Sequence, residues 1–157
     1  MDNYVVLKFI HILCAMVVVG TGAGIAFFQF MAFRSKNISA IMITARHVVL
    51  ADWIFTTPAI IGQFITGVLL MRRLSYSFDA PWFLSVISLF IFIGCCWVPV
   101  VFIQYKLKAM AESAQQTGNL DEQFFRWMKM WTALGIPAFI AIIGIIWLMV
   151  AKPMAII

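Results

Sequence analysis

The sequence predicts an all-α membrane protein in which four antiparallel transmembrane helices form one bundle. The composition supports this class, because 64% of the 157 residues are hydrophobic and 11% are charged, whereas a soluble domain is about half apolar and about a quarter charged. The apolar residues also fall in four blocks, each near the ~20 residues that cross ~30 Å of hydrocarbon as a helix. We therefore expect one integral membrane domain over residues 1–157. Its helices are predicted at Val5–Met31, Val48–Met71, Trp82–Ile103 and Ala133–Val150.

The first block is predicted to be a retained helix and not a signal peptide. It is longer than the apolar region of a signal peptide, and its end, FMAFRSKN, has no small-residue cleavage site. Gly20 and Gly24 have the G-x-x-x-G spacing that lets membrane helices approach each other closely. On the opposite face of the same helix, five residues line up at 100° per residue. That face consists of His11, Ala15, Val18, Gly22 and Gln29.

The second block is expected to carry a polar stripe along one face. Residues 34–46 begin with the polar RSKN and continue with the apolar ISAIMITA, so we expect them to lie along the membrane interface and run into this helix. His47 points roughly 140° away from the stripe. Pro58 frees a backbone carbonyl, which membrane helices tolerate where neighbouring groups satisfy it. The stripe consists of Asp52, Thr56, Ala59, Gln63 and Thr66.

The third and fourth helices are predicted to be joined by the most hydrophilic part of the chain, residues 106–130. KLKAMAESAQQ continues the third helix beyond its apolar block, TGN ends it, and LDEQFFRWMKMW begins the fourth helix. The acidic residues at that start are placed where the helix dipole favours them. A short loop, RRLSYSFDAP, joins the second and third helices and ends in the turn residues Asp79 and Pro81.

The distribution of positive charge predicts the orientation in the membrane. Seven basic residues lie in the two connections 34–46 and 106–130, and four lie on the opposite side. The positive-inside rule then places these two connections in the cytosol and both termini in the periplasm of a bacterial cytoplasmic (inner) membrane. The net charge of +5 therefore reflects membrane topology, and we expect no nucleic-acid partner. The seven are Arg34, Lys36, Arg46, Lys106, Lys108, Arg126 and Lys129, and the four are Lys8, Arg72, Arg73 and Lys152.

Several function classes find no support in the sequence. It contains no nucleophile triad, phosphate-binding loop, H-E-x-x-H or zinc spacing, so a hydrolase and a nucleotide-driven pump are not indicated. No segment resembles the selectivity filter of a channel. Cys14, Cys95 and Cys96 fall near mid-membrane without a C-x-x-C pattern. We interpret them as small packing residues.

The depth of the polar residues predicts two layers inside the bundle. His11, Gln63 and Ser88 lie a similar distance from the outer helix ends, whereas Gln29, Asp52, Thr56, Pro99 and Pro137 form an inner layer. His11 and His47 are then roughly 20 Å or more apart at 1.5 Å per residue. Two histidines that ligate one haem must bring their nitrogens to about 4 Å. A haem held by both histidines of a single chain is therefore excluded.

His11 is the leading candidate for a functional residue, because ionisable residues inside membrane helices often mark sites. Either it ligates a haem iron, or it is a structural residue bonded to Gln63 or to a freed carbonyl. Lys152 lies on the same side and either extends to the interface or neutralises an acidic ligand such as a haem propionate. Met149 is a candidate second axial ligand. Asp52 either pairs with Arg46 or Arg34, or forms a site for a proton or a substrate amine.

Two family resemblances rest on particular segments. LKFIHILCAMVVVGTGAG, VVLADWIFTTPAIIGQFITGVLLM, CCWVPVVFIQYKLKAMAESA and LGIPAFIAIIGIIWLMVAKP resemble a bacterial membrane family known only as a domain of unknown function, the 2269 type. More distantly, the chain is similar to HemJ-type protoporphyrinogen oxidases and to the membrane domain of copper-resistance protein D. The shared features are His11 in KFIHIL, the stretch TPAIIGQFITGVLL, Phe125–Arg126, and Lys152–Pro153.

The second resemblance implies a haem b protein in redox chemistry or haem biosynthesis, with a porphyrin or a quinone as partner. His11 would ligate the iron, with Gln63, Met149 and Lys152 nearby. Two features of HemJ-type proteins are missing: an Asn-Glu before the proline of the last helix, where this chain has Leu134–Ile136, and a histidine in the third helix. Two alternatives remain: a non-catalytic accessory or assembly subunit of a membrane complex, and a copper or small-solute carrier. A homodimer would also allow a ligand to bind between copies.

Overall fold

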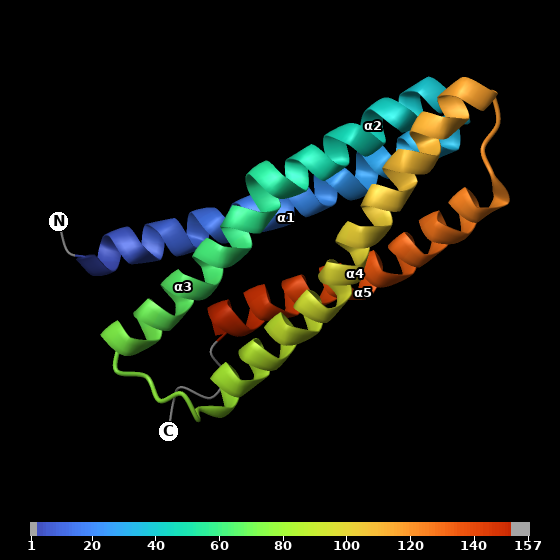
Figure 1. Ribbon diagram of the computed structural model, residues 1–157. Coiled ribbons are helices and arrows are strands. Elements are labelled where there is room, and N and C mark those ends of the chain that lie inside the picture. The colour runs from blue at the N-terminus through green and yellow to red at the C-terminus, as the bar shows by residue number, and fades with distance from the viewer. Residues whose placement is uncertain (1–2, 152–157) are drawn as a thin grey trace.

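The computed structural model describes residues 3–151, and all regular structure in this range is helical (Figure 1). Four helices are long and apolar enough to cross a membrane: α1, the uninterrupted run from Ile38 to Arg73, α4 and α5. The all-helical structure confirms the predicted fold class, and the four helices run in alternating directions. The elements are α1 (Asn3–Ser35), α2 (Ile38–Ala51), the π-helical η1 (Asp52–Thr56), α3 (Thr57–Arg73), α4 (Pro81–Thr117) and α5 (Glu122–Ala151).

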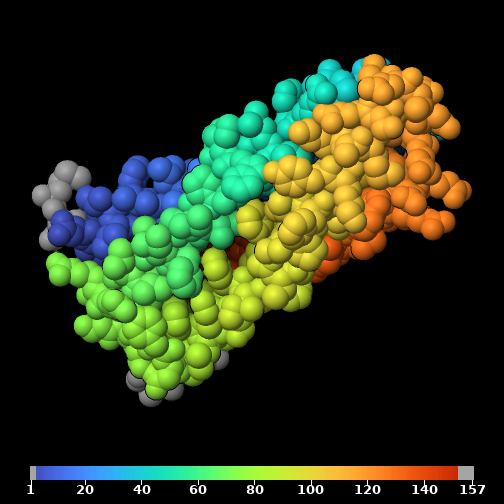
Figure 2. All heavy atoms as spheres, in the orientation of Figure 1, coloured from blue at the N-terminus to red at the C-terminus, as the bar shows by residue number. Residues whose placement is uncertain are grey.

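The helices form two layers: α1 with α2 and α3, and α4 with α5 (Figure 1). The layers lie close together where α2 contacts α4 and diverge toward the other end of the molecule. α1 packs along α3 and α2, whereas α4 packs along α5 and α2. We call the end where α1 starts and α5 finishes the terminal end, and the opposite end the loop end (Figure 1). Figure 2 shows the surface hollowed between α3 and α4, with α5 visible at the floor of the hollow. Stacking of Phe64 on Phe90, with ring centres 5.9 Å apart, bridges α3 and α4.

At the loop end the helices extend beyond the apolar blocks. α4 has 37 residues and is therefore about 55 Å long, well above the ~30 Å of a hydrocarbon core. Residues 38–46 do not form a separate interfacial segment, because they are the first turns of α2, which packs on α1 and α4. The reason is local: Asn37 caps the helix by accepting a hydrogen bond from the Ala40 N–H, and Ile41 and Ala45 point into the core.

The predicted break after the third helix is confirmed at TGN. Gly118 caps α4 with φ of +76°, and its N–H donates to the Ala114 carbonyl at 2.8 Å. A left-handed conformation of this kind favours glycine because a side chain would clash with the backbone. α5 then begins at Glu122, so the acidic residue occupies the first turn as expected.

The loop end has a well-packed core of its own. Leu107, Ala111 and Phe124 are almost fully buried where α4 and α5 pack together. Around this core, Arg46 of α2 pairs with Glu112 of α4 at 2.6 Å, and Ser39 donates to Gln115 at 3.0 Å. The core and these links hold α2 against α4, which positions the second helix for the pocket described below.

The second long helix changes its winding at η1. The Thr57 N–H bonds to the Asp52 carbonyl, five residues earlier, in place of the usual four. Pro58 follows directly and has no N–H to offer, and its ring crowds the carbonyl four residues before it. The wider turn relieves this crowding. It also places Asp52 at the start of the irregular segment, with its side chain buried.

Among residues 3–151, the predicted close contact through Gly20 and Gly24 is not made. A Cβ atom added at either glycine would meet nothing within 4 Å. The close approach between helices lies instead at Gly62 and Gly67 of α3, which face α1. Gly62 and Gly67 do not have the G-x-x-x-G spacing, so the spacing did not indicate which glycines lie at a close helix contact.

Candidate functional site

The first polar cluster joins α1 to α3 through His11. Its Nδ1 lies 2.9 Å from the Thr66 hydroxyl, and its Nε2 lies 3.0 Å from the Gln63 side-chain nitrogen. The structural alternative for His11, a hydrogen bond with Gln63, is therefore present. Ser88, predicted in the same layer, is exposed, and its hydroxyl bonds to the Leu84 carbonyl of its own helix.

The hydrogen bonds assign the tautomer of His11. The Thr66 hydroxyl has one proton and donates it to the Gly62 carbonyl at 2.6 Å, so it must accept from His11 Nδ1–H. His11 Nε2 is then left with a lone pair, which accepts from the Gln63 amide. The ring is thus oriented by Thr66, and its metal-binding lone pair points to the side chain of Gln63.

Close helix packing surrounds this cluster. A Cβ atom at Gly62 would lie 2.8 Å from the sulfur of Cys14, and one at Gly67 would lie 3.3 Å from Cε1 of His11. The two glycines therefore let α1 approach α3 closely enough for the His11 hydrogen bonds to form. Cys14 is a packing residue at this contact, as the sequence suggested.

The other residues predicted around a haem at His11 have different neighbours. Met149 is half-buried and packs against the cluster formed by Met71, Trp82 and Val86. Lys152 lies outside the described residues. Of the residues predicted around the haem, His11 and Gln63 are therefore in contact, whereas Met149 packs elsewhere. An iron bond through Nε2 would require the space that the Gln63 amide fills.

The second polar cluster lies nearer the loop end and centres on Asp52. Asp52, Thr56 and Gln104 are 3–5% exposed. Thr56 and Gln104 provide the polar neighbours of the carboxyl group. Even so, Asp52 Oδ2 and Gln104 Oε1 are buried without a hydrogen-bond partner. Such groups normally find partners in folded proteins.

Of the two roles predicted for Asp52, the ion pair with Arg46 or Arg34 does not form among the described residues. Arg46 pairs with Glu112, and Arg34 lies over the ring of Phe30 at 5.9 Å. Arg34 and Arg46 lie on helical turns nearer the loop end, where the ring of Phe30 and the carboxylate of Glu112 are their partners. Within residues 3–151, no lysine or arginine lies within ion-pair distance of Asp52.

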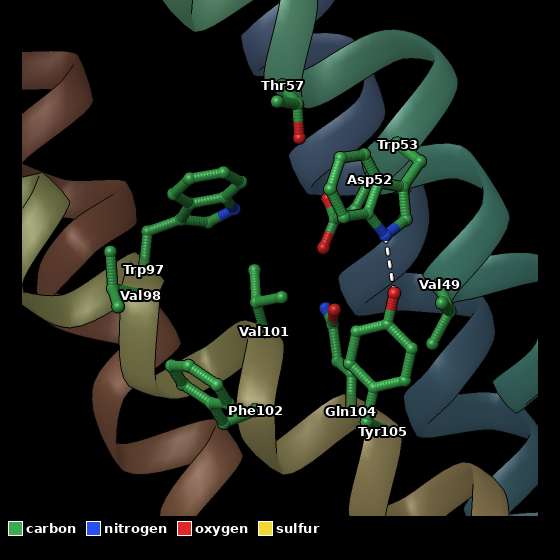
Figure 3. A pocket seen from close by; sticks show the side chains of 10 residues that line it. All are labelled: Val49, Asp52, Trp53, Thr57, Trp97, Val98, Val101, Phe102, Gln104 and Tyr105. Carbon is green, nitrogen blue, oxygen red and sulfur yellow. Dashed lines mark hydrogen bonds between the residues drawn. The ribbon is translucent and has the colours of Figure 1, made fainter.

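Asp52 lines a pocket between η1 and α4, shown in Figure 3. The cavity measures about 190 Å³. Its floor contains Asp52 and Gln104, and Trp97 adds an indole N–H that is also buried without a partner. Its rim is exposed and largely aromatic, and the Trp53 indole there donates to the Tyr105 hydroxyl. The lining consists of Val49, Asp52, Trp53, Thr57, Trp97, Val98, Val101, Phe102, Gln104 and Tyr105.

Sequence reasoning placed Asp52 and Thr56 inside the bundle but missed their partners. Gln104 is the available signal, because it is a polar residue directly after the third apolar block, at the depth of Asp52. Gln29, predicted in the same layer, is buried but does not line the pocket. His47 is exposed on α2, in line with its position away from the polar stripe.

The comparison with known families adds the class of the protein. Residues 5–153 match the model of the family described as predicted integral membrane protein (DUF2269). The chain belongs to this family. No curated protein and no solved structure matches it. Family membership and the four candidate spans make the chain an integral membrane protein that contacts the lipid bilayer.

The DUF2269 description names no activity, so the chemistry of this protein has to be inferred from its candidate site. The resemblance to this family is confirmed over nearly the whole chain. The more distant likeness to HemJ-type oxidases and copper-resistance protein D stays a prediction, as do the orientation and the bacterial inner membrane. Among residues 3–151, no group of three or more His, Cys, Asp or Glu side chains is placed to hold a metal ion.

Proposed function

We propose that this protein binds a small amphipathic molecule, drawn from the bilayer, in the pocket between η1 and α4. One observation carries the proposal: the buried oxygen of Asp52 has no partner and borders a cavity. An intramembrane ionisable residue is costly unless it is paired or serves a site. The unpartnered Gln104 oxygen and Trp97 N–H border the same cavity. A ligand there could form hydrogen bonds with three polar groups that have no partner in the protein.

The position of the pocket favours a ligand from the membrane. Its rim consists of exposed side chains, among them Phe102 at 65% and Trp53 at 58%. Lys106 follows the pocket residue Tyr105 directly, so the pocket lies near the end of the apolar part of α4. Tryptophan and tyrosine are enriched at this depth, where membrane meets water. A molecule with an apolar body and a polar head concentrates in the same region.

A ring-sized neutral probe tests the pocket. We expect 2-phenylethanol to bind the detergent-purified protein saturably, as followed by saturation-transfer NMR. Val101→Trp should weaken this binding about 10-fold or more, because Val101 lines the cavity and the added indole would occupy the space of the probe. Val150→Trp is the matched control, since it adds the same side chain at an exposed position. Equal binding by both variants would contradict the proposal.

Binding of haem b through His11 is a second candidate function. The hydrogen bond at His11 Nδ1 favours it, and the Gln63 amide would have to leave Nε2 for an iron to bind there. Histidine ligands of metals usually donate their other ring N–H to a nearby acceptor, which orients the ring. Thr66 accepts in this way from Nδ1–H. His11 Nε2 keeps its lone pair and faces the unbranched side chain of Gln63. Bound haem would supply redox chemistry, and a porphyrin or quinone would be the partner.

A visible spectrum tests this second candidate. Protein purified from haem-replete cells should show a Soret band that shifts on addition of dithionite and disappears in His11→Ala. His47→Ala serves as the control, because His47 is exposed and far from the cluster in sequence. A stable but colourless wild-type protein would rule out haem binding and leave His11 as a structural link between α1 and α3.

A further inference from the structure

We propose that the ligand of the Asp52 pocket is a small organic cation, such as a protonated amine with one aromatic ring. The charged nitrogen would lie at the Asp52 carboxylate, and the ring between the aromatic side chains of α4 and η1. This inference rests on the proposed binding function of the same pocket and names its ligand class.

The charges around the pocket favour a cation. No lysine or arginine in the described part of the chain pairs with Asp52, so the protein itself leaves the carboxylate without a counter-ion. Gln104 adds a second unpartnered acceptor, its Oε1, close to the carboxyl group (Figure 3). An ammonium group has up to three donors and no acceptor. It therefore satisfies both oxygens at once, whereas a neutral hydroxyl donates to one oxygen and can accept from the Trp97 N–H, which an ammonium group leaves unpaired.

The walls of the pocket suit a positively charged nitrogen attached to a ring. Trp97 and Phe102 of α4 and Trp53 of η1 line it, together with Tyr105. Cations are attracted to aromatic faces within about 6 Å, and tryptophan is the strongest of these partners. A dry cavity of about 150 Å³ accommodates benzene, and this one measures about 190 Å³. One ring with a short aminoalkyl chain therefore matches the volume.

Two probes of equal shape and different charge test the inference. Phenethylammonium and 2-phenylethanol share the ring and the two-carbon chain. The ratio of their affinities for the purified protein at pH 7 therefore measures the effect of the charge. We expect the wild-type protein to bind phenethylammonium at least about 30-fold more tightly than 2-phenylethanol. This factor lies in the lower part of the range measured for buried charge pairs. Asp52→Asn should remove this preference while 2-phenylethanol still binds. Asp79→Asn, in the exposed α3–α4 loop, should keep it.

Each alternative result has a definite reading. Equal binding of the two probes by wild type would overturn the cation assignment and leave the pocket with a neutral ligand, such as a quinol. Binding of neither probe would overturn the proposed function itself. A preference that survives in Asp52→Asn would place the cation elsewhere. If Asp52→Asn does not fold, the wild-type preference still decides whether the ligand is a cation. Val101→Trp, which should weaken binding of both probes, then shows whether they bind in this pocket.

Discussion

Replacing Phe124 with alanine is expected to lower the free energy of unfolding by about 3–5 kcal/mol, the usual cost of removing a buried phenylalanine. Phe124 is 1% exposed in the loop-end core and stacks on Phe33 with ring centres 6.4 Å apart. This core lies among turns that carry charged residues, beyond the apolar blocks. Burial there removes apolar surface from water, which it would not do among lipid chains.

The neighbouring residue provides a matched control for this prediction. Phe125 has the same side chain but is 42% exposed, so Phe125→Ala should cost less than about 1 kcal/mol. Titration with sodium dodecyl sulfate in mixed micelles, followed by tryptophan fluorescence, measures both variants. Equal losses would show that the loop-end core does not stabilise the bundle. We also expect Phe124→Ala to weaken probe binding, because the core holds α2 and α4 on either side of the pocket.

Gly62→Ala is expected to destabilise the protein by about 1–3 kcal/mol, as overpacking does. The new Cβ would lie 2.8 Å from the Cys14 sulfur, so α1 and α3 must separate or Cys14 must rotate. Separation would also stretch the hydrogen bonds of His11 to Gln63 and Thr66. Denaturant titration of the purified variant gives the loss in stability.

A second substitution makes the cause testable. Cys14→Ala removes the sulfur, so Gly62→Ala added to it should cost nothing, because alanine is the better helix former. Gly94→Ala is the control, since a Cβ there meets nothing within 4 Å. A double variant that is as unstable as Gly62→Ala would show that the contact with Cys14 is not responsible.

Much of the architecture could be predicted because it depends on short segments. Apolar blocks of membrane-spanning length predict helices wherever they occur, and Gly118 ends α4 through its own backbone conformation. The inward face that carries His11 and the stripe that carries Asp52 follow from helical geometry alone. The layer shared by His11 and Gln63 followed from counting residues along two helices, and the two side chains are in contact.

The partners of these residues could not be predicted in the same way. One of the two roles predicted for Asp52 was an ion pair with Arg46 or Arg34, but Glu112 of α4 pairs with Arg46, and Gln104 of the same helix is a neighbour of Asp52. For the glycine pair with the expected spacing, Gly20 and Gly24, an added Cβ meets nothing within 4 Å in the described part of the chain, whereas one at Gly62 meets Cys14. These outcomes depend on which helices approach each other and at what depth.

The sequence by itself therefore determined the class of the protein, its helices and the faces on which its polar residues lie, because these follow from residue type and helical period. Only the tertiary structure decided that both ring nitrogens of His11 form hydrogen bonds, with Thr66 and Gln63. It also decided that Asp52 borders a pocket and has no counter-ion among the described residues. The physical reason is that hydrogen bonds and cavities arise between helices. Their geometry depends on crossing positions that no single segment specifies.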